Sequence, residues 1–405
     1  MRKTWVSFYM KKLIKKAAKP PIMVIYYLMM LINRVNKRVI LFESNRGRNY
    51  SGNPRFIYEE MVARGLDQVY QCYFILEDVT TELPGKVKKV KRISLPYFHL
   101  FAKAGIWVSD TRMPTYIKKR RNTIYIQTWH GTPLKKLALD MLQVSMSGES
   151  SLEDYKKNFK KNSKTWDYLL SQNSYSTEIF RRAFAFQKEV LEIGYPRNDL
   201  LFHHNNSEEI NRLKKKLQLP TDKKVILYAP TWRDNEHYGP ESYKFSSQIN
   251  FSYLKENLSK DYILLVKAHY LVGEQINTAD YKGFLYQFNA SFDIAELYLI
   301  SDLLITDYSS VMFDYSILRR PMIFYTYDLE QYKNTLRGFY FDFLQEAPGP
   351  IVITTEQLVE EILKWDFKQY EERYLVFIKK YNHADCGEAS KKVVDLISSY
   401  GGTEN

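Results

Sequence analysis

The sequence predicts an α/β fold built from two Rossmann-like domains that face a cleft. Apolar, β-favouring runs alternate with helical patterns in two blocks, which is typical of doubly wound parallel sheets. A polar, charged stretch over residues 202–222 separates the blocks. The 405 residues are enough for two domains that each bury a core. We therefore expect domains over residues 38–200 and 201–405, preceded by a distinct segment over residues 1–37.

The first block contains six apolar runs of strand length, over residues 39–42, 70–76, 106–108, 123–128, 168–171 and 190–193. A helix is predicted to begin with Asn53 as its N-cap and Pro54 in its first turn, and to run to about Ala63. A second helix is predicted from Ser174 to about Ala185. The polar, serine-rich stretch over residues 140–164 is predicted to be a mobile loop or a helical excursion.

The second block repeats the pattern after the polar stretch, which itself carries a charged helix. Its predicted strands cover residues 225–229, 262–267, 303–306 and 322–325, with helices between them. From about Thr355 to near Ser399 the pattern is mostly helical.

Basic residues are concentrated at the N-terminus. Lys and Arg exceed Asp and Glu by 59 to 46, but ten of the basic residues lie within residues 1–38, where no acidic residue occurs. Without those ten the balance is 49 to 46, so the body is almost neutral. A basic body is expected of a nucleic-acid-binding protein, whereas a basic arm on a neutral body favours an anionic surface.

Within this arm, residues 21–32 read PIMVIYYLMMLI. Twelve apolar residues are too few to cross a bilayer, which takes about 20. Basic residues rather than a small-residue cleavage site follow, which argues against a secretory signal. We expect this segment to lie on an anionic membrane surface, and the alternative is a buried first helix with a solvated basic face.

Several common catalytic patterns are absent from the sequence. There is no GxG pair, no GxxxxGK[ST] loop, no HExxH and no pair of aspartates spaced as DxD. The two cysteines, Cys72 and Cys386, have no metal-ligand spacing and fit a reducing compartment. We expect catalysis without a cofactor or a protein-held metal, and leave a donor-associated Mg²⁺ open.

Two loops that follow predicted strands combine titratable and hydroxyl side chains. His130 follows the run Ile124-Tyr125-Ile126 and is succeeded by Gly131, and its pKa range suits general base work on an alcohol. In the second loop, Asp307, Ser309 and Ser310 are predicted to cap a helix that begins near Val311. Hydroxyls at a helix N-terminus can hold a phosphate, and both loops lie where α/β folds place ligands.

Five motifs resemble those of the CDP-glycerol glycerophosphotransferase family of teichoic acid synthesis: WHGTP at 129–133, YAPTWRD at 228–234, KAH at 267–269, TDYSS at 306–310 and RGFYFD at 337–342. They occur in the family's order, over about residues 38–390. The resemblance implies a GT-B arrangement, with an acceptor domain first and a CDP-donor domain second. It also implies catalytic roles for His130 and His269, without deciding which of them abstracts the proton.

The residues expected to bind the donor lie around the same loops. Arginines can pair with its phosphates in bidentate fashion, and hydroxyls at a helix start can donate to its diphosphate. The expected set comprises Arg197, Asn198, Thr231, Arg233, Thr306, Asp307, Ser309, Ser310, Asp314 and Arg337. A hinge role is the alternative for the segment of Arg197 and Asn198, and capping is the alternative for Asp307.

The resemblance implies a peripheral transferase at the cytoplasmic face of the cell membrane. It would move glycerol phosphate from CDP-glycerol to the terminal hydroxyl of a polyprenyl-diphosphate-linked acceptor and release CMP. A CDP-ribitol-using relative, a nucleotide-sugar glycosyltransferase and a non-catalytic scaffold are the alternatives. No nucleic-acid partner is expected, and the sequence leaves open a homo-oligomer and the choice between single addition and polymerisation.

Overall fold

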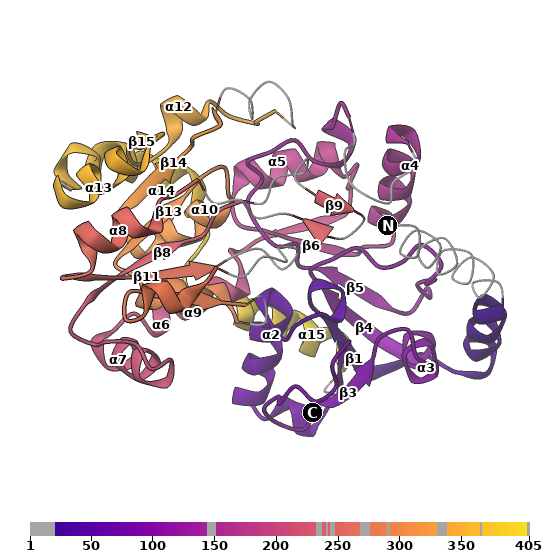
Figure 1. Cartoon of the computed structure of the whole chain (residues 1–405). Coiled ribbons are helices and arrows are strands. Elements are labelled where there is room, and N and C mark those ends of the chain that lie inside the picture. Colours follow the sequence, from indigo (N-terminus) through magenta and orange to yellow (C-terminus); the bar gives the residue numbers. More distant parts are fainter. Residues whose placement is uncertain are drawn as a thin grey trace, which may run out of the picture.

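A computed structural model describes residues 21–143, 151–231, 237–239, 242–243, 248–267, 276–289, 292–329, 338–364 and 367–402. Each half of the chain forms a parallel sheet with helices on its faces, and the two halves lie side by side (Figure 1). The predicted α/β fold with two parallel sheets is therefore confirmed.

The first sheet has the strand order β3-β2-β1-β4-β5-β6-β7, and every adjacent pair is parallel. Its strands are β1 (Asn36–Glu43), β2 (Gln71–Leu76), β3 (Lys88–Lys91), β4 (Ala104–Ser109), β5 (Ile124–Gln127), β6 (Tyr168–Ser171) and β7 (Glu189–Glu192). All six predicted strands are present. The strand that was not predicted is β3, at the sheet edge.

The second sheet has the order β12-β11-β8-β13-β14-β15 and is also parallel. Its strands are β8 (Lys224–Tyr228), β11 (Tyr262–Lys267), β12 (Leu285–Phe288), β13 (Leu303–Thr306), β14 (Met322–Tyr325) and β15 (Ile351–Val352). A separate antiparallel pair is formed by β9 (His237–Gly239) and β10 (Ser242–Tyr243). The four predicted strands form the interior of the six-stranded sheet, and the unpredicted β12 and β15 are its edges.

Most connections between successive strands contain an α-helix, which is usual in a parallel sheet. In the first half the helices are α2 (Gly52–Ala63), α3 (Leu95–Lys103), α4 (Leu152–Ser163), α5 (Ser174–Ala183) and α6 (Asp199–His203). In the second half they are α7 (Ser207–Lys216), α8 (Phe251–Leu258), α9 (Ile294–Ile300), α10 (Val311–Tyr315), α12 (Phe343–Glu346), α13 (Thr355–Lys364), α14 (Glu371–Tyr381) and α15 (Ala389–Gly401). The predicted charged helix is α7, and the excursion within residues 140–164 contains α4.

Alternate residues of each strand enter cores on opposite faces of the sheet, because side chains of a strand point alternately up and down. In β1, Val39 and Leu41 pack with α3, while Ile40 and Phe42 pack with α2 and α15. These positions are at most 1% exposed. The two covered faces explain why the strands read as continuous apolar runs.

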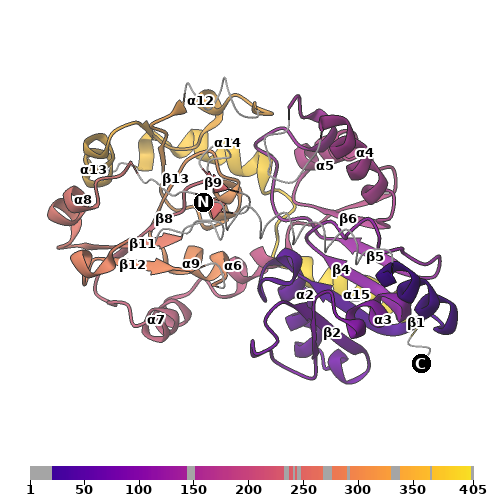
Figure 2. The same cartoon turned by 45° about the vertical axis from the view of Figure 1, so that its right-hand side comes forward.

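The last helix returns to the first sheet. In both views α15 lies beside α2 and the strands of the N-terminal half (Figures 1 and 2). Val393, Val394 and Ile397 of α15 belong to the same core as Ile40 and Phe42. The C-terminal segment therefore begins in the second half and ends packed on the first. The domain limits at residues 37/38 and 200/201 stay predictions.

Residues 21–32 form a helix that is packed on one side. Tyr26 is 1% exposed, and its hydroxyl donates to the carbonyl of Lys118 at 2.8 Å. Ile22, Met29 and Met30 pack on the same core at helical spacing. This segment is thus continuous with the first half of the molecule on its inner side. Among the described residues, no helix has both the length and the apolar character needed to cross a bilayer.

Candidate active site

The two predicted loops meet between the halves of the molecule. Gly131 follows β5 and has φ +157°, and a Cβ added there would come within 3.0 Å of the Ser310 hydroxyl after β13. The WHGTP loop of the first sheet therefore lies directly against the TDYSS loop of the second. Because both loops follow strand carboxyl ends, the arrangement agrees with the ligand position predicted for facing α/β domains.

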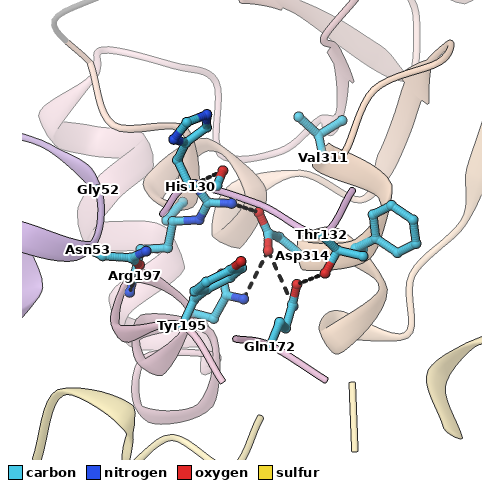
Figure 3. Close-up of polar contacts among 12 residues, drawn as sticks. Gly52, Asn53, His130, Thr132, Gln172, Tyr195, Arg197, Val311 and Asp314 are labelled. Carbon is cyan, nitrogen blue, oxygen red and sulfur yellow. Dashed lines mark hydrogen bonds and ion pairs between the residues drawn. The ribbon is translucent and has the colours of Figure 1, made fainter. Parts of the chain in front are cut away.

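His130 presents one ring nitrogen to this junction. Its Nδ1 lies 2.9 Å from the carbonyl oxygen of Asp110, and since a carbonyl only accepts, Nδ1 carries the hydrogen. The lone pair of the neutral ring is then on Nε2. In Figure 3 the imidazole points away from the polar network beneath it, and the residue is exposed. This tautomer is the one a general base needs.

The surroundings keep the imidazole uncharged. Loss of solvation lowers the pKa of His130 to about 4, although the hydrogen bond to Asp110 acts in the opposite direction. The positive charges of Arg197 and Arg46 lower this pKa further. His130 thus stays available as a base throughout the neutral pH range.

Trp129 fixes the plane of the imidazole. The two rings are stacked with centroids 4.4 Å apart and planes 25° apart. Trp129 is itself buried among aromatic residues, including Phe184 at 4.6 Å. Its φ of +52° is uncommon for a bulky residue. Such backbone strain persists where the surrounding structure demands it, as at active sites.

Asp110 was not singled out from the sequence, although it follows a predicted strand end. Its carboxylate accepts from the Ser44 hydroxyl and from the backbone N–H of Asn45, both at 2.8 Å. The residue is 6% exposed, and burial raises its pKa to about 7. Asp110 therefore joins the loop after β1 to the ring of His130.

Asn53 also holds the His130 loop. Its amide Nδ2 donates to the carbonyls of Thr128 and Trp129, at 3.2 and 3.0 Å, and its Oδ1 accepts from Arg197 N at 3.2 Å. The predicted N-cap role of Asn53 is wrong, because α2 begins two residues earlier than predicted, with Ser51 as its N-cap. The side chain is taken up by tertiary contacts instead.

Arg197 and Asp314 form a buried polar network across the two halves (Figure 3), and Asn198 belongs to the same network. Arg197 forms an ion pair with Asp314 through Nη2 and donates from Nη1 to the His130 carbonyl at 3.0 Å. Asn198 donates to the same carboxylate at 3.0 Å. These contacts place the network directly beneath the WHGTP loop. Their donor-binding role stays a prediction, and their contacts indicate that they position His130.

Two residues that the sequence did not suggest complete this network. Gln172 donates to Asp385 at 2.8 Å and to Asp314 at 3.4 Å, while its Oε1 accepts from Thr132 at 2.6 Å. Burial, with the charge of Asp314 nearby, raises the pKa of Asp385 to about 7. The WHGTP loop is thus tied through Thr132 and Gln172 to the segment between α14 and α15.

The predicted donor-side residues of the second sheet lie around the carboxyl ends of β8 and β13. Asp307 accepts from the backbone N–H of Thr231 at 2.9 Å, and Thr306 donates to the carbonyl of Ala229 at 2.8 Å. Thr306 and Asp307 are at most 3% exposed. Both residues therefore join the loop after β8 to the loop after β13.

The capping prediction for Asp307 is wrong. Ser310 occupies the N-cap position of α10, without a side-chain cap hydrogen bond, and Asp307 is directed at the neighbouring loop. The helix is also short, since a 3₁₀ turn over Ser316–Leu318 follows it directly. Ser309 and Ser310 are half-buried, and the Ser310 hydroxyl lies beside Gly131, the residue that follows His130.

Three predicted residues, His269, Arg233 and Arg337, lie outside the described residues, and their roles stay predictions. Close to the first of them, Lys267 ends β11 and donates from Nζ to the carbonyls of Asn289 and Phe292. Burial lowers the pKa of Lys267 to about 8. Within the described ranges, no three His, Cys, Asp or Glu residues are grouped so that they could hold a metal ion.

Curated relatives of the chain are teichoic acid polymerases and transferases. A teichoic acid poly(glycerol phosphate) polymerase of Bacillus spizizenii is 47% identical over 364 residues, covering 89% of this chain and 92% of the relative. The Bacillus subtilis polymerase of the same name is 44% identical over 96% of this chain, which spans only 52% of that relative. A poly(ribitol-phosphate) polymerase of Bacillus spizizenii is 30% identical.

Solved structures of the wall teichoic acid polymerase TagF share the fold. They align with a TM-score of 0.87 at 41% identity, covering 97% of both chains, and one variant with a histidine replaced was soaked with CDPG. The family model of CDP-Glycerol:Poly(glycerophosphate) glycerophosphotransferase matches residues 25–399. With its motif loops assembled around His130, this chain belongs to the CDP-glycerol:poly(glycerophosphate) glycerophosphotransferase family.

Proposed function

We propose that this protein transfers glycerol phosphate from CDP-glycerol to the terminal hydroxyl of a lipid-linked teichoic acid precursor and releases CMP. One observation carries the proposal. The uncharged His130, whose Nε2 is available as a base, lies where the first half of the molecule meets the Ser310 loop of the second half. A base beside a phosphate-binding loop is what an alcohol-to-phosphoryl transfer requires.

In the proposed reaction the acceptor hydroxyl gives its proton to Nε2 of His130. Its oxygen forms a bond to the phosphorus that carries glycerol, and the bond from that phosphorus to the bridging oxygen of CMP breaks. The electron pair of that bond leaves with CMP. Fixed donors stabilise the charge on the transferring phosphoryl group. His269 is proposed to assist on the donor side, together with Arg233 and Arg337.

Glycerol is proposed as the donor's polyol rather than ribitol, because the glycerol-phosphate relatives are much more similar in sequence than the ribitol-phosphate one. Release of CMP should be measured with CDP-glycerol, CDP-ribitol and a UDP-sugar, using one soluble short-chain acceptor. The proposal requires CDP-glycerol to be the preferred donor. Preference for CDP-ribitol would move the protein to the ribitol branch, and preference for a UDP-sugar would overturn the proposal. The reaction is proposed to need no protein-held metal, and a donor-associated Mg²⁺ is left open.

The hydroxyls of Ser309 and Ser310 are proposed to donate to the diphosphate of CDP-glycerol. Replacing both serines by alanine should weaken donor binding by about 100-fold or more, because hydrogen bonds to a charged group are each worth about 1.5–3 kcal/mol. Calorimetric titration with CDP-glycerol tests this. The matched control is Ser399→Ala, because Ser399 lies on the surface of α15, where its hydroxyl donates to the Leu396 carbonyl. Unchanged affinity in the double variant would mean that these serines only shape the loop.

We also propose that the protein is peripheral at the cytoplasmic face of an anionic membrane and docks through the outer side of helix 21–32. That side exposes Leu31 by 82%, Ile32 by 79%, Val24 by 58% and Leu28 by 55%. Arg34 and Arg38 are exposed just beyond it. Apolar side chains flanked by cations fit the interface of an anionic bilayer.

Replacing Leu28, Leu31 and Ile32 together by serine should release the protein from anionic vesicles, because the buried apolar area is lost. Deleting residues 1–36 is a poorer test, since it also removes the buried Tyr26. Co-sedimentation with anionic and neutral vesicles at low and high salt measures the effect. The control is Leu375→Ser with Val376→Ser on α14, which are 49% and 63% exposed. Equal binding of the triple variant and the wild type would refute this docking surface.

A further inference from the structure

The loop after β1, residues 44–51, lies at the topological switch point of the first sheet, where the order in which the chain adds strands reverses. The chain runs outward from β1 to β2 and β3, then returns to the other side of β1 as β4. Open parallel sheets bind ligands at the carboxyl ends of the strands flanking such a point. The flanking strands here are β1 and β4, and β4 is followed by Asp110, which holds His130.

This loop has a strained backbone. Asn45, Arg46 and Gly47 are successive residues with φ of +45°, +58° and +78°. Asn and Gly tolerate this region, whereas an arginine there is uncommon. The conformation is held by the N–H of Asn45 on Asp110 at 2.8 Å and by the N–H of Glu77 on the Gly47 carbonyl at 2.6 Å. Strain that is maintained by its surroundings is a mark of functional loops.

The strained residue presents an exposed cation beside the base. Arg46 is exposed, and within the described part of the chain no hydrogen bond or ion pair of its guanidinium is found. By contrast, Arg92 and Arg197 of the same half are paired with Glu43 and Asp314. The charge of Arg46 nevertheless reaches His130, since it contributes to lowering the pKa of that ring. A cation left unpaired near a base is available to an anionic ligand.

We propose that Arg46 binds the phosphodiester of the acceptor, one unit back from the hydroxyl that His130 deprotonates. This rests on the proposed function, in which the acceptor ends in glycerol phosphate and carries a negative charge at that position. Arg46 belongs to the first sheet and is connected to His130 through Asn45 and Asp110. The proposed donor loops after β8 and β13 belong to the second sheet. Arg46 would therefore orient the acceptor hydroxyl toward Nε2.

Arg46→Asn removes the positive charge but should keep the backbone conformation of the loop, because asparagine adopts positive φ more readily than arginine. We expect this variant, and Arg46→Gln, to raise the KM for a soluble glycerol-phosphate oligomer by about tenfold. The dissociation constant for CDP-glycerol should stay within twofold of the wild type. Arg46→Lys should recover part of the loss, since lysine supplies the charge without the bidentate fork. Thermal unfolding should show Arg46→Asn to be at least as stable as the wild type.

The decisive comparison uses a second acceptor, in which a neutral ether replaces the phosphodiester next to the terminal glycerol. The wild type should use it with a raised KM, and Arg46→Asn should cause no further loss. The control is Arg121→Gln, an exposed arginine before the amino end of β5, which should change neither KM. An equal loss with both acceptors, an unchanged KM for the charged acceptor, or a weakened affinity for CDP-glycerol would overturn the proposal. Failure of the wild type to transfer glycerol phosphate to any acceptor would instead contradict the proposed function.

Discussion

Replacing His130 by alanine is expected to reduce turnover with CDP-glycerol by about 100-fold or more, the scale of a lost acid–base group. The fold should survive, because the side chain is exposed at a strand end. Steady-state CMP release measures turnover, and calorimetric titration should show unchanged donor affinity. His204→Ala is the matched control, since His204 is also exposed and lies far along the chain beside Glu209. Near wild-type turnover of His130→Ala would remove His130 from its assigned role.

The same assignment fixes the pH profile of the wild type. Loss of solvation among the surrounding groups disfavours the charged imidazole and lowers its pKa, so protonation removes the base only as the pH falls through about 4, rather than through the usual 6.5. The acid limb of kcat/KM should therefore lie near pH 4, with no loss attributable to His130 between pH 7 and 5. Asp110→Asn should show the same acid limb. This variant therefore distinguishes titration of the His130 ring from titration of the neighbouring Asp110 carboxyl. An acid limb near 6.5 in both proteins would contradict a neutral base whose pKa is lowered.

Replacing Asp314 by asparagine is expected to destabilise the protein by about 3–5 kcal/mol, because it leaves the buried Arg197 without its counter-charge. The side chains of Arg197 and Asp314 are 12% and 1% exposed. Urea unfolding followed by fluorescence measures the loss. Turnover should also fall, since Arg197 holds the His130 carbonyl from the same position.

Asp395→Asn is the control for this change. Asp395 pairs with Arg64, but its side chain is 57% exposed, so its loss should cost less than about 1 kcal/mol. Replacing the buried pair together, by Arg197→Met with Asp314→Leu, should restore much of the stability without restoring turnover. Recovery of turnover in that double variant would show that the network does not position His130. A loss for Asp314→Asn no larger than the control would show that the ion pair contributes little.

The parts of the fold that were predictable are those in which local pattern and tertiary environment agree. Residues 168–171, 262–267, 303–306 and 322–325 are strands within the predicted bounds, because burial on both faces makes them apolar throughout. The missed β3 reads KKVK, with only Val90 buried, and β15 has two residues. Edge strands carry too little apolar pattern to be recognised from sequence alone.

The position of the site was predictable, whereas its internal contacts were not. His130 and Ser310 follow apolar strands, which places both at carboxyl ends. The partners of Asp314, by contrast, come from segments more than 100 residues away, and no local pattern reports such pairings. For Asp307 the local capping preference was overridden by a tertiary partner, the Thr231 N–H. Propensity for a cap is a weak guide where two strand ends adjoin.

The N-terminal helix is packed on one side, as the alternative interpretation from sequence requires, and its place on a membrane surface stays a prediction. Tyr26 is buried in the first half, as a packed first helix requires, while Leu31 and Ile32 are almost fully exposed. An apolar run does not distinguish these roles, because its residues are apolar on every side. Which of its apolar side chains become buried depends on how much neighbouring structure is available to cover the helix.

Mass spectrometry of the acceptor after incubation tests the central claim most directly. A soluble acceptor ending in a free hydroxyl should be incubated with CDP-glycerol, with the wild type and His130→Ala in parallel. The account predicts that the wild type increases the acceptor mass by whole glycerol phosphate units and releases one CMP per unit, and that the variant does so at least about 100-fold more slowly. An acceptor of unchanged mass, or one that gains a sugar or ribitol phosphate instead, would contradict the account.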